Sequence, residues 1–274
     1  MKVWFITGTS RGFGREWAEA ALERGDSVAA TARNAASLDD LAAQYPDTLL
    51  PIKLDVTDRE AVFAAVAQAH EKFGRIDIAV NNAGYGHFGA IEELTEAEAR
   101  AQLETNVFGA LWVTQAVLPI MRAQQSGRIL QVSSIGGITA FPLLGMYHAS
   151  KWALEGFSQS LAAEVAPYGI KITLIEPTGY STDWSGDSAI RSAAMPEYEH
   201  IREARRRRVS AAGYAGDPKA TREAVLKVVD ADEPPLRIFF GRGPLETAEA
   251  DYASRIETWE AWREVSEAAH GNPA

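Results

Sequence analysis

Residues 2–14 read KVWFITGTSRGFG, a short apolar run followed by a turn that contains three glycines. The run at 2–7 is short and rich in β-formers, which predicts a strand, and a helix is expected to begin inside the turn. Glycines allow a backbone to approach a pyrophosphate closely, and the free N–H groups of a helix N-terminus attract its charge. The stretch therefore predicts an α/β sheet with a nucleotide bound at its first turn.

Six further β-rich runs follow the first one along the chain, and most of them are continuously apolar. They lie at 27–31, 49–54, 76–80, 128–133, 170–175 and 236–240. Helical stretches separate the runs, with expected capping boxes at Thr57–Glu60 and Thr95–Glu98. This alternation predicts a Rossmann-type, doubly wound parallel sheet of about seven strands with helices on both faces.

The composition narrows the function classes. The 274 residues carry a net charge of −10 and no cysteine, which excludes disulfides, thiolate zinc sites and a cysteine nucleophile. The acidic balance argues against nucleic acid as a partner. No apolar run approaches the ~20 residues of a membrane span, so we expect a cytoplasmic protein that uses no membrane. The arginine-rich run 202–208 is interpreted as a solvated helix face.

A single domain, 1–274, accounts for the pattern. An insertion at about 180–213 is expected over the carboxyl edge of the sheet as a substrate lid, and a helical extension is expected at about 244–270. The helical extension is predicted to form a lid on the substrate site.

The residues that end the second strand indicate which cofactor binds. An acidic side chain there would bond the ribose hydroxyl of NAD, whereas arginine accommodates the 2′-phosphate of NADP. The chain has Arg33 at that point and no acidic residue, and Arg11 lies in the glycine turn on the same edge. Two guanidinium groups suit a doubly charged phosphate, so NADP(H) is favoured over NAD(H).

Five motifs occur in an order and spacing that are specific to one family. They are Thr7-Gly8-x-x-x-Gly12-x-Gly14, Asn81-Asn82-Ala83-Gly84, Asn106, Ser134 and Tyr147-x-x-x-Lys151. On these residues the chain resembles the short-chain dehydrogenase/reductase (SDR) family over nearly its whole length. Its length and C-terminal extension are similar to the branch that contains retinol and 17β-hydroxysteroid dehydrogenases.

The chemistry follows from the residues together with this resemblance. Tyr147 and Lys151 are four residues apart on a helix, so an ammonium beside the phenol is expected to lower its pKa and let it act as acid or base. Ser134 can stabilise the charge that develops on the substrate oxygen. The resemblance implies that Lys151 also holds the nicotinamide ribose and that Asn106 holds a water of a proton relay.

The turn, the strand ends and the resemblance together define the expected cofactor contacts. They are Gly8, Ser10, Arg11, Gly12, Phe13, Gly14, Arg33, Asp55, Val56, Asn82, Ala83, Gly84, Tyr147, Lys151, Pro177, Gly179, Tyr180 and Thr182. The chain departs from the family at Thr178, where glycine is usual. This departure affects the path of the loop after Pro177. No metal site is expected.

The substrate pocket is expected to be apolar, because the loops at the carboxyl edge carry few charges. Its predicted lining residues are Tyr85, His87, Ile135, Phe141, Leu144 and Trp184. We expect a lipophilic ketone, aldehyde or alcohol as substrate. His148, although next to Tyr147, should face elsewhere, because neighbouring helical residues point about 100° apart. By resemblance, helices near 100–121 and 147–166 should pair subunits into a homodimer or homotetramer.

Other uses of the same scaffold are compatible with the sequence. The chain could be a keto-acyl reductase, with the arginine run as a weak candidate for an acyl-carrier entrance, or an NAD-linked alcohol dehydrogenase. A nucleotide-sensing regulator without chemistry is a third reading. Because Ser134, Tyr147 and Lys151 are all present, the regulator is the least favoured of the three.

Overall fold

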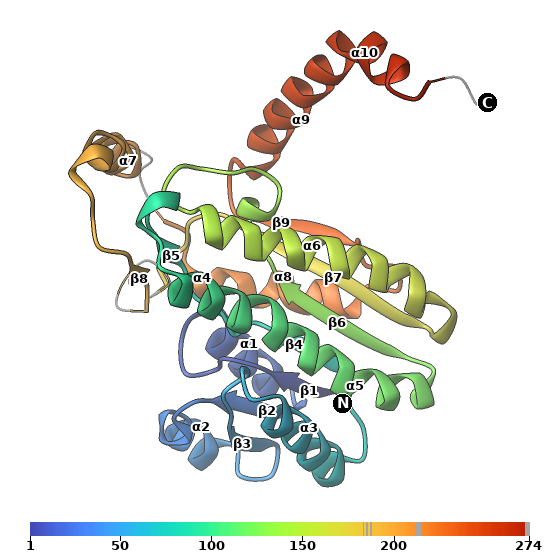
Figure 1. The fold of residues 1–274 in the computed structure, drawn as a ribbon. Coiled ribbons are helices and arrows are strands. Elements are labelled where there is room, and N and C mark those ends of the chain that lie inside the picture. The colour runs from blue at the N-terminus through green and yellow to red at the C-terminus, as the bar shows by residue number, and fades with distance from the viewer. Residues whose placement is uncertain (183, 185, 187, 212–214, 272–274) are drawn as a thin grey trace.

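The computed structural model describes residues 1–182, 184, 186, 188–211 and 215–271. Its centre is a parallel sheet of seven strands in the order β3-β2-β1-β4-β6-β7-β9 (Figure 1). The strands are β1 Val3–Ile6, β2 Ser27–Ala32, β3 Leu49–Lys53, β4 Ile78–Asn81, β6 Gly127–Val132, β7 Ile170–Pro177 and β9 Arg237–Phe240. The prediction of about seven parallel strands is confirmed. The order reverses between β1 and β4, where such sheets form a ligand crevice at their carboxyl edge.

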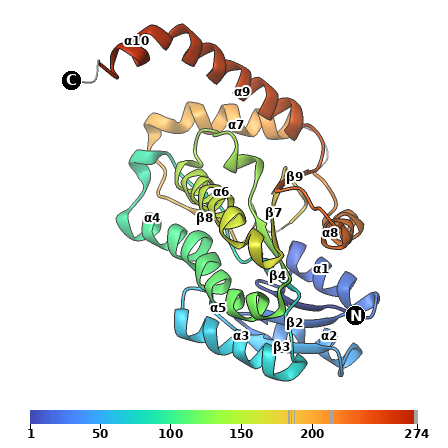
Figure 2. The ribbon, with the colours of Figure 1, turned by 90° about the vertical axis from the view of Figure 1, so that its right-hand side faces the viewer.

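Helices cover both faces of the sheet, as predicted (Figures 1 and 2). One face carries α1 Gly12–Glu23, α2 Asp39–Gln44 and α8 Thr221–Asp230, and the other carries α3 Arg59–Phe73, α5 Gly109–Gln124 and α6 Gly145–Val165. Successive residues of β1 point to opposite faces: Trp4 and Ile6 belong to the core beside α1, and Phe5 to the core beside α3. Both cores are apolar, which explains why the strands read as continuous apolar runs.

The two expected capping boxes have different outcomes. Thr95 caps α4 (Glu96–Leu103): its hydroxyl accepts from Glu98 N at 3.2 Å, and the Glu98 carboxylate accepts from Thr95 N at 2.9 Å. The prediction of a box at Thr57 is wrong. Asp58 caps α3 instead, accepting from Ala61 N at 3.0 Å, while the Thr57 hydroxyl donates to Asp55 at 2.8 Å. A carboxylate is the stronger acceptor for a helix N-terminus.

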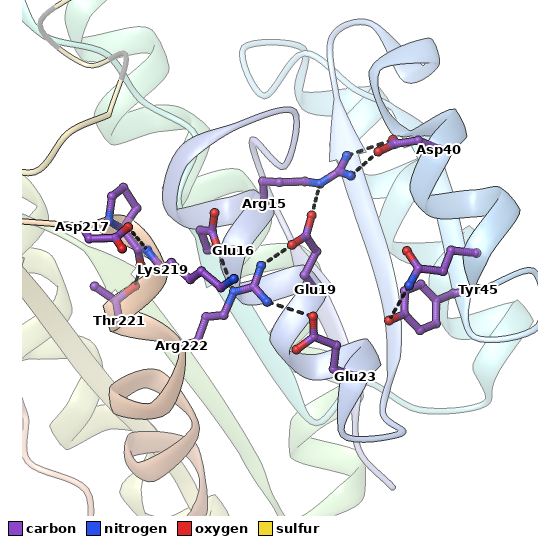
Figure 3. Close-up of polar contacts among 12 residues, drawn as sticks. Arg15, Glu16, Glu19, Glu23, Asp40, Tyr45, Asp217, Lys219, Thr221 and Arg222 are labelled. Carbon is purple, nitrogen blue, oxygen red and sulfur yellow. Dashed lines mark hydrogen bonds and ion pairs between the residues drawn. The ribbon is translucent and has the colours of Figure 1, made fainter.

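Ion pairs fix α1, the helix that follows the glycine turn, between its neighbours (Figure 3). Arg15 bonds Glu19 within α1 at 2.6 Å and Asp40 of α2 at 3.1 Å. Arg222 of α8 reaches three carboxylates along α1, those of Glu16, Glu19 and Glu23. Both arginine side chains are more than four-fifths buried, so these contacts are screened less than surface pairs and hold the turn in place.

The insertion forms a small structure of its own at the carboxyl edge. Strands β5 His87–Phe88 and β8 Ile190–Arg191 pair in parallel, and α7 Glu199–Ala211 follows. Arg202 of α7 contacts the buried Glu93 and donates to Met195 O at 2.9 Å, which attaches this helix to the body. None of the helices in the described part of the chain has the length and apolar character that crossing a membrane requires.

The C-terminal extension is helical, as predicted, and consists of α9 Pro244–Ala261 and α10 Arg263–Ala268. Its first half is attached to the loop after β6, where Asp251 accepts from Thr139 at 3.3 Å and Arg255 donates to Ile138 O at 3.1 Å. Its second half projects from the body (Figures 1 and 2), because α9 continues straight beyond these contacts. Within one chain, the projecting half therefore does not form the expected lid.

Candidate active site

The glycine turn between β1 and α1 has a backbone that requires glycine. Gly8 and Gly12 have φ values of 70° and 60°, in the left-handed region. A Cβ on Gly14 would lie 2.4 Å from the carbonyl oxygen of Gly8 and 2.5 Å from the Asn82 amide nitrogen. Because no side chain fits at Gly14, the start of α1 approaches the carboxyl ends of β1 and β4 closely. This leaves a cradle of backbone N–H groups of the kind that binds phosphate.

Asn82 ties the glycine turn to the end of β4. Its amide donates to Thr7 O at 2.9 Å and to Gly8 O at 3.0 Å. The Thr7 hydroxyl accepts from the backbone of Asn82 and of Ala83, both at 3.0 Å. The side chain of Asn82 is thus a support for the turn. Thr7 is part of the glycine-turn motif, but the sequence does not predict this supporting role for its hydroxyl.

The neighbouring Asn81 connects a strand to a helix. Its amide donates to the α5 residues Ala110 O at 3.3 Å and Thr114 Oγ1 at 3.1 Å. Asn81 therefore links β4 to α5. Val56 is buried under the same helix. A Cβ on Gly109 would lie only 2.7 Å from the Val56 side chain, so the two residues are in close contact.

The remaining residues of the expected cofactor site surround the turn. Arg11 and Arg33 are both exposed, at the N-terminus of α1 and after the end of β2. Asp55 is exposed on the loop after β3. A Cβ on Gly12 would lie 3.6 Å from Thr182, so the loop after β7 faces the turn. The ring of Phe13 instead packs inward on Trp17, with centroids 5.4 Å apart, which leaves only its backbone for a cofactor.

The loop after β7 explains the unusual Thr178. The backbone amide of Thr178 donates to Phe240 O at 3.0 Å. Its hydroxyl lies beside Gly241, and a Cβ on Gly241 would be only 2.1 Å from that hydroxyl oxygen. Gly241 has a φ of 112°. The loop can lie beside β9 with threonine at position 178 because Gly241, which has no side chain, leaves room for it. Tyr180, two residues on, packs its ring on Phe13 at 4.9 Å.

Asn106 lies in a π-helical turn, Glu104–Phe108, between α4 and α5. Its amide donates to Tyr85 O and to Ser150 Oγ, both at 3.1 Å, and its Oδ1 accepts from Tyr85 N at 3.2 Å. Such turns are frequent at functional sites, because they turn a side chain out of the regular helix. Here the turn directs Asn106 towards α6, which carries Tyr147 and Lys151.

The structure brings Ser134, Tyr147 and Lys151 together, as the sequence predicts. Ser134 follows β6, and its hydroxyl accepts from Gly136 N at 3.0 Å and bonds the Tyr147 hydroxyl. Tyr147 and Lys151 lie on one face of α6, with the Lys151 nitrogen 5.7 Å from the tyrosine ring centroid. The same nitrogen donates to Val132 O at 2.8 Å.

Burial dominates the electrostatics of this group. It raises the pKa of Tyr147 to about 12, against a lowering by the Ser134 hydrogen bond, and lowers the pKa of Lys151 to about 8. The expectation that Lys151 lowers the pKa of Tyr147 is not met in this structure, because the ammonium is directed at Val132 O and is itself partly discharged by burial. The phenol therefore keeps its proton at neutral pH.

Two aromatic side chains, Trp184 and Phe88, cover Tyr147 and are called the aromatic roof. The ring of Trp184 lies 4.9 Å from that of Tyr147, and Phe88 packs on Trp184 at 5.3 Å. A Cβ on Gly86 would come within 2.7 Å of Trp184, so the indole lies directly on the loop after β4. The expected pocket residue Trp184 is thus beside the catalytic candidate. Ile135 follows Ser134, and Phe141 and Leu144 lie on the loop that leads into α6.

The two histidines near the site face away from it. His87 is buried, bonds Ser192 at 2.8 Å and stands 3.9 Å from Glu98, so its expected place in the open pocket is corrected to a link between the insertion and the body. Burial lowers the pKa of His87 and keeps it neutral. His148 bonds Gly136 O and Phe141 N, both at 2.9 Å. It supports the loop after Ser134, consistent with the expectation that it faces away from the chemistry.

A buried carboxyl pair behind the site was not anticipated. Glu176 ends β7 beside Glu155 of α6, and Arg237 bonds Glu155 at 2.9 Å and stands 3.6 Å from Glu176. Burial and the neighbouring Glu155 raise the pKa of Glu176 to about 8. An acidic residue inside an otherwise apolar strand was the available signal. Within the described ranges, no group of His, Asp and Glu side chains is placed to hold a metal ion.

Comparison with known proteins agrees with this geometry. The family model of short chain dehydrogenases matches residues 2–191. The chain belongs to this family. An oxidoreductase of Botryotinia fuckeliana is 45% identical over 97% of this chain and 98% of its own length. A 3-ketodihydrosphingosine reductase of Bacteroides thetaiotaomicron is 34% identical, over 88% of each chain.

Solved structures of the family have the same fold. A short-chain dehydrogenase of Streptomyces avermitilis superposes with a TM-score of 0.92 at 40% identity, over 98% of this chain and all of the other. Short-chain dehydrogenases bind a nicotinamide cofactor. For example, an alcohol dehydrogenase of Thermococcus sibiricus, with a TM-score of 0.74 and 26% identity over 88% and 96% of the two chains, was solved with 5-hydroxy-NADP. This chain is accordingly an SDR oxidoreductase.

Proposed function

We propose that this SDR oxidoreductase uses NADP(H) to interconvert a lipophilic ketone or aldehyde and its alcohol, with Tyr147 as the acid and base. One observation carries the proposal: the Tyr147 hydroxyl is bonded to Ser134, on one helix face with Lys151, beneath the ring of Trp184. A proton donor, an oxygen-binding hydroxyl and an apolar cover thus converge at the carboxyl edge of the sheet.

The residues of the glycine turn fit a dinucleotide. The missing Cβ atoms of Gly8 and Gly14 leave room for a pyrophosphate, and the N–H groups at the start of α1 have no side-chain cap. Arg11 and Arg33 would hold the 2′-phosphate, since both side chains are exposed at the same edge and a guanidinium group can bond a phosphate in a bidentate way. When bound, the cofactor supplies or accepts a hydride. Lys151 would hold its ribose.

The side chains would then move the proton. In reduction, Tyr147 donates its hydroxyl proton to the carbonyl oxygen that receives negative charge, while the Ser134 hydroxyl donates a hydrogen bond to that oxygen. Lys151 can return a proton to the phenolate, because its pKa of about 8 lies near neutral pH. Asn106 would hold the water through which Lys151 is recharged. In oxidation each transfer runs in reverse.

The cover of the site favours apolar substrates. Trp184 and Phe88 form an aromatic surface over Tyr147, and Ile135 lies beside Ser134. Burying such surface against a substrate is worth roughly 25 cal/mol per Å² of apolar area. The relative from Bacteroides thetaiotaomicron is named as a 3-ketodihydrosphingosine reductase, and a keto substrate agrees with the proposal for this chain.

Initial-rate measurements test the proposal. The panel contains lipophilic ketones and aldehydes, each with NADPH or NADH, and lipophilic alcohols, each with NADP⁺ or NAD⁺. We expect turnover of apolar ketones with a higher kcat/KM for NADPH than for NADH. A higher kcat/KM for a keto-acyl thioester on its carrier would favour the keto-acyl reductase instead. Preference for NAD⁺ with alcohols would favour an NAD-linked dehydrogenase, and absence of turnover across the panel would leave the regulator as the better account.

A further inference from the structure

The C-terminal arm, residues 244–268, has an apolar face whose large side chains remain 46–63% exposed, although Leu245 and Tyr252 line a cavity with Ile138 and Phe239 of the same chain. The large exposed side chains on it are Leu245, Tyr252, Ile256, Trp259, Trp262 and Val265. Those at 245, 252, 256 and 259 fall within an arc of roughly 60° on a helix of 100° per residue. Trp259 and Trp262 are each 63% exposed. A solvated helix does not concentrate aromatic residues in this way, so the face indicates a docking surface.

The charge of the arm restricts what can cover it. The arm carries seven acidic residues and two basic ones. Glu249 and Glu260 lie directly beside the apolar arc, at about 20–40° from its edge. Two arms packed on each other would bring these carboxylates together, and an anionic lipid surface would repel them. The complementary surface must therefore be basic.

One helix of this acidic chain is basic, and it lies at the same end of the molecule as the arm (Figures 1 and 2). Five arginines fall within residues 202–208 of α7. Arg206 and Arg207 have side chains that are 61% and 78% exposed and pair only with Glu199 and Glu203 among the contacts described. Exposed pairs of this kind contribute little, so the arginines can exchange these partners for the carboxylates of an arm.

We propose that the C-terminal arm of one subunit docks on helix α7 of a second copy of this chain, with its apolar face inward and its acidic flank against the arginines. A two-fold axis makes the contact reciprocal, because each chain supplies one arm and one α7. The arm–arm pair and the membrane surface lack the charge complementarity that this arrangement has.

Docking at α7 reaches the active site through direct contacts. The Arg205 guanidinium lies 4.5 Å from the Phe88 ring centroid, Phe88 packs on Trp184, and Trp184 lies over Tyr147. An arm that holds α7 in place therefore also holds the aromatic roof. The expected lid would then be supplied by the partner subunit. This consequence for the substrate, unlike the docking itself, rests on the proposed function.

Charge reversal in the full-length protein tests the docking. The arm variant is Glu249→Lys with Glu260→Lys, and the helix variant is Arg206→Glu with Arg207→Glu. All four side chains are exposed. Each variant alone places like charges in both contacts, so light scattering should show half the mass of the parent assembly, with dissociation at least about tenfold stronger at low salt. An equimolar mixture should regain the parent mass, because both contacts of a mixed pair are complementary.

The outcomes separate the possible occupants. If an arm folds onto α7 of its own chain, the mass does not change and mixing has no effect, and the proposal is overturned. A monomeric parent also overturns it. Recovery on mixing shows in addition that both variants are folded. Glu71→Lys on α3, an exposed acid far from both elements, is the matched control and should keep the parent mass.

Two further measurements test the apolar face and the link to the site. Trp259→Ser with Trp262→Ser should also halve the mass, without a change of charge. With an apolar ketone, the arm variant should raise KM several-fold at nearly constant kcat, and mixing with the helix variant should restore KM. If the mass is halved but KM is unchanged, the docking is supported and the partner lid is contradicted. If the enzyme turns over no ketone, the mass measurements still test whether the arm docks on α7 of a second copy.

Discussion

Tyr147 is nearly inaccessible to solvent, and this determines which form of the phenol is present. Burial holds its pKa at about 12, so the acid needed for reduction is fully protonated at neutral pH. The base needed for oxidation must form by loss of a proton to Lys151, whose pKa is lowered to about 8 by burial. With Tyr147 as the proposed acid and base, we expect reduction to be faster near neutral pH and oxidation to be faster at higher pH.

Replacing Tyr147 with phenylalanine removes the proton donor and nothing else. We expect kcat for ketone reduction to fall at least ~10²-fold, the low end for a positioned acid, while the affinity for NADPH changes little. Stopped-flow rates and calorimetric titration measure the two quantities. Tyr168→Phe, at an exposed residue after α6, is the control and should have parent activity. Near-parent turnover by Tyr147→Phe would mean that another group is the acid.

Glu176 gives a prediction about stability. Its folded-state pKa of about 8 lies above the ordinary value of 4.5 because of burial and Glu155. Between these two values the folded protein holds a proton on Glu176 that the unfolded chain releases, so the contribution of Glu176 to stability is highest below pH 4.5 and falls as the pH rises to about 8. Glu176→Gln mimics the protonated form and should therefore stabilise the protein at pH 8.

The expected gain for Glu176→Gln at pH 8 is at least about 1 kcal/mol, or roughly 2–4 °C in Tm for a chain of this size. At pH 5 the variant and the parent should melt at nearly the same temperature. Calorimetry at both values checks the difference. Glu233→Gln, an exposed carboxyl paired with Lys171, should show no such gain at pH 8. An equal effect of Glu176→Gln at both pH values would contradict the assignment.

At the scale of elements, we expect the junction of β2 with the following turn to determine which nicotinamide cofactor is preferred. Arg33 leaves the sheet at this junction, and Ala32 before it is buried. Exchanging Ala32 for Asp and Arg33 for Ser would add an acceptor for the ribose hydroxyl and remove a phosphate contact worth about 1.5–3 kcal/mol. We expect the ratio of kcat/KM for NADPH over NADH to fall at least about tenfold.

Steady-state kinetics with both cofactors measure this ratio. Arg100→Ser, at an exposed arginine of α4, changes the net charge as Arg33→Ser does and should leave the ratio unchanged. If the parent already binds NADH more tightly than NADPH, the role given to Arg33 is wrong. A drop in activity with both cofactors alike would indicate damage to the end of β2 instead.

For the C-terminal arm, the sequence predicts the helix at the right residues but not its position in the molecule. The pattern at 246–268 predicts a helix, and helices α9 and α10 are there. Their direction is set by Asp251 and Arg255, which attach α9 to the loop around Ile138 and so direct its second half into solvent. The apolar side chains that suggested a lid are therefore available to another chain.

At the scale of the whole molecule, the outer faces of α5 and α6 carry further exposed aromatic residues. Phe108, directly before α5, is 38% exposed and stacks on Trp112 at 5.9 Å, and Trp152 on α6 is 41% exposed. We expect these faces to pair subunits around a two-fold axis. Light scattering at micromolar concentration should give about four times the 29.7 kDa of one chain when this face and the arm–α7 contact form two separate two-fold interfaces, and twice that mass when only one of them forms.

A charge at the centre of this face should weaken the pairing. Phe108→Glu would bury an unpaired carboxylate between subunits, so the mass should fall by half while the circular dichroism of the fold is kept. Glu71→Lys on α3 should have the parent mass. A parent that is monomeric, or a Phe108→Glu variant with unchanged mass, would rule out the α5–α6 face as an interface.

The fold and the chemical group at the site could be predicted from the sequence, because both depend on features that are close along the chain. Continuous apolar runs, the glycine turn and the spacing of Tyr147 from Lys151 each report on a few neighbouring residues, and the parallel arrangement follows from their alternation. The capped start of α4 at Thr95 is local in the same sense. Where two local signals compete, as at Thr57 and Asp58, the sequence alone did not decide.

Only the tertiary structure decided features that depend on residues far apart in the chain. The pKa of Tyr147 is set by how completely distant segments exclude water from it. The side chain of Asn82 bonds a turn some 74 residues earlier, and Thr178 fits because Gly241 lies beside it. The arm projects because of two contacts with the loop around Ile138. Such contacts arise when strands and helices pack, and a linear pattern of apolar and polar residues does not encode which surfaces meet.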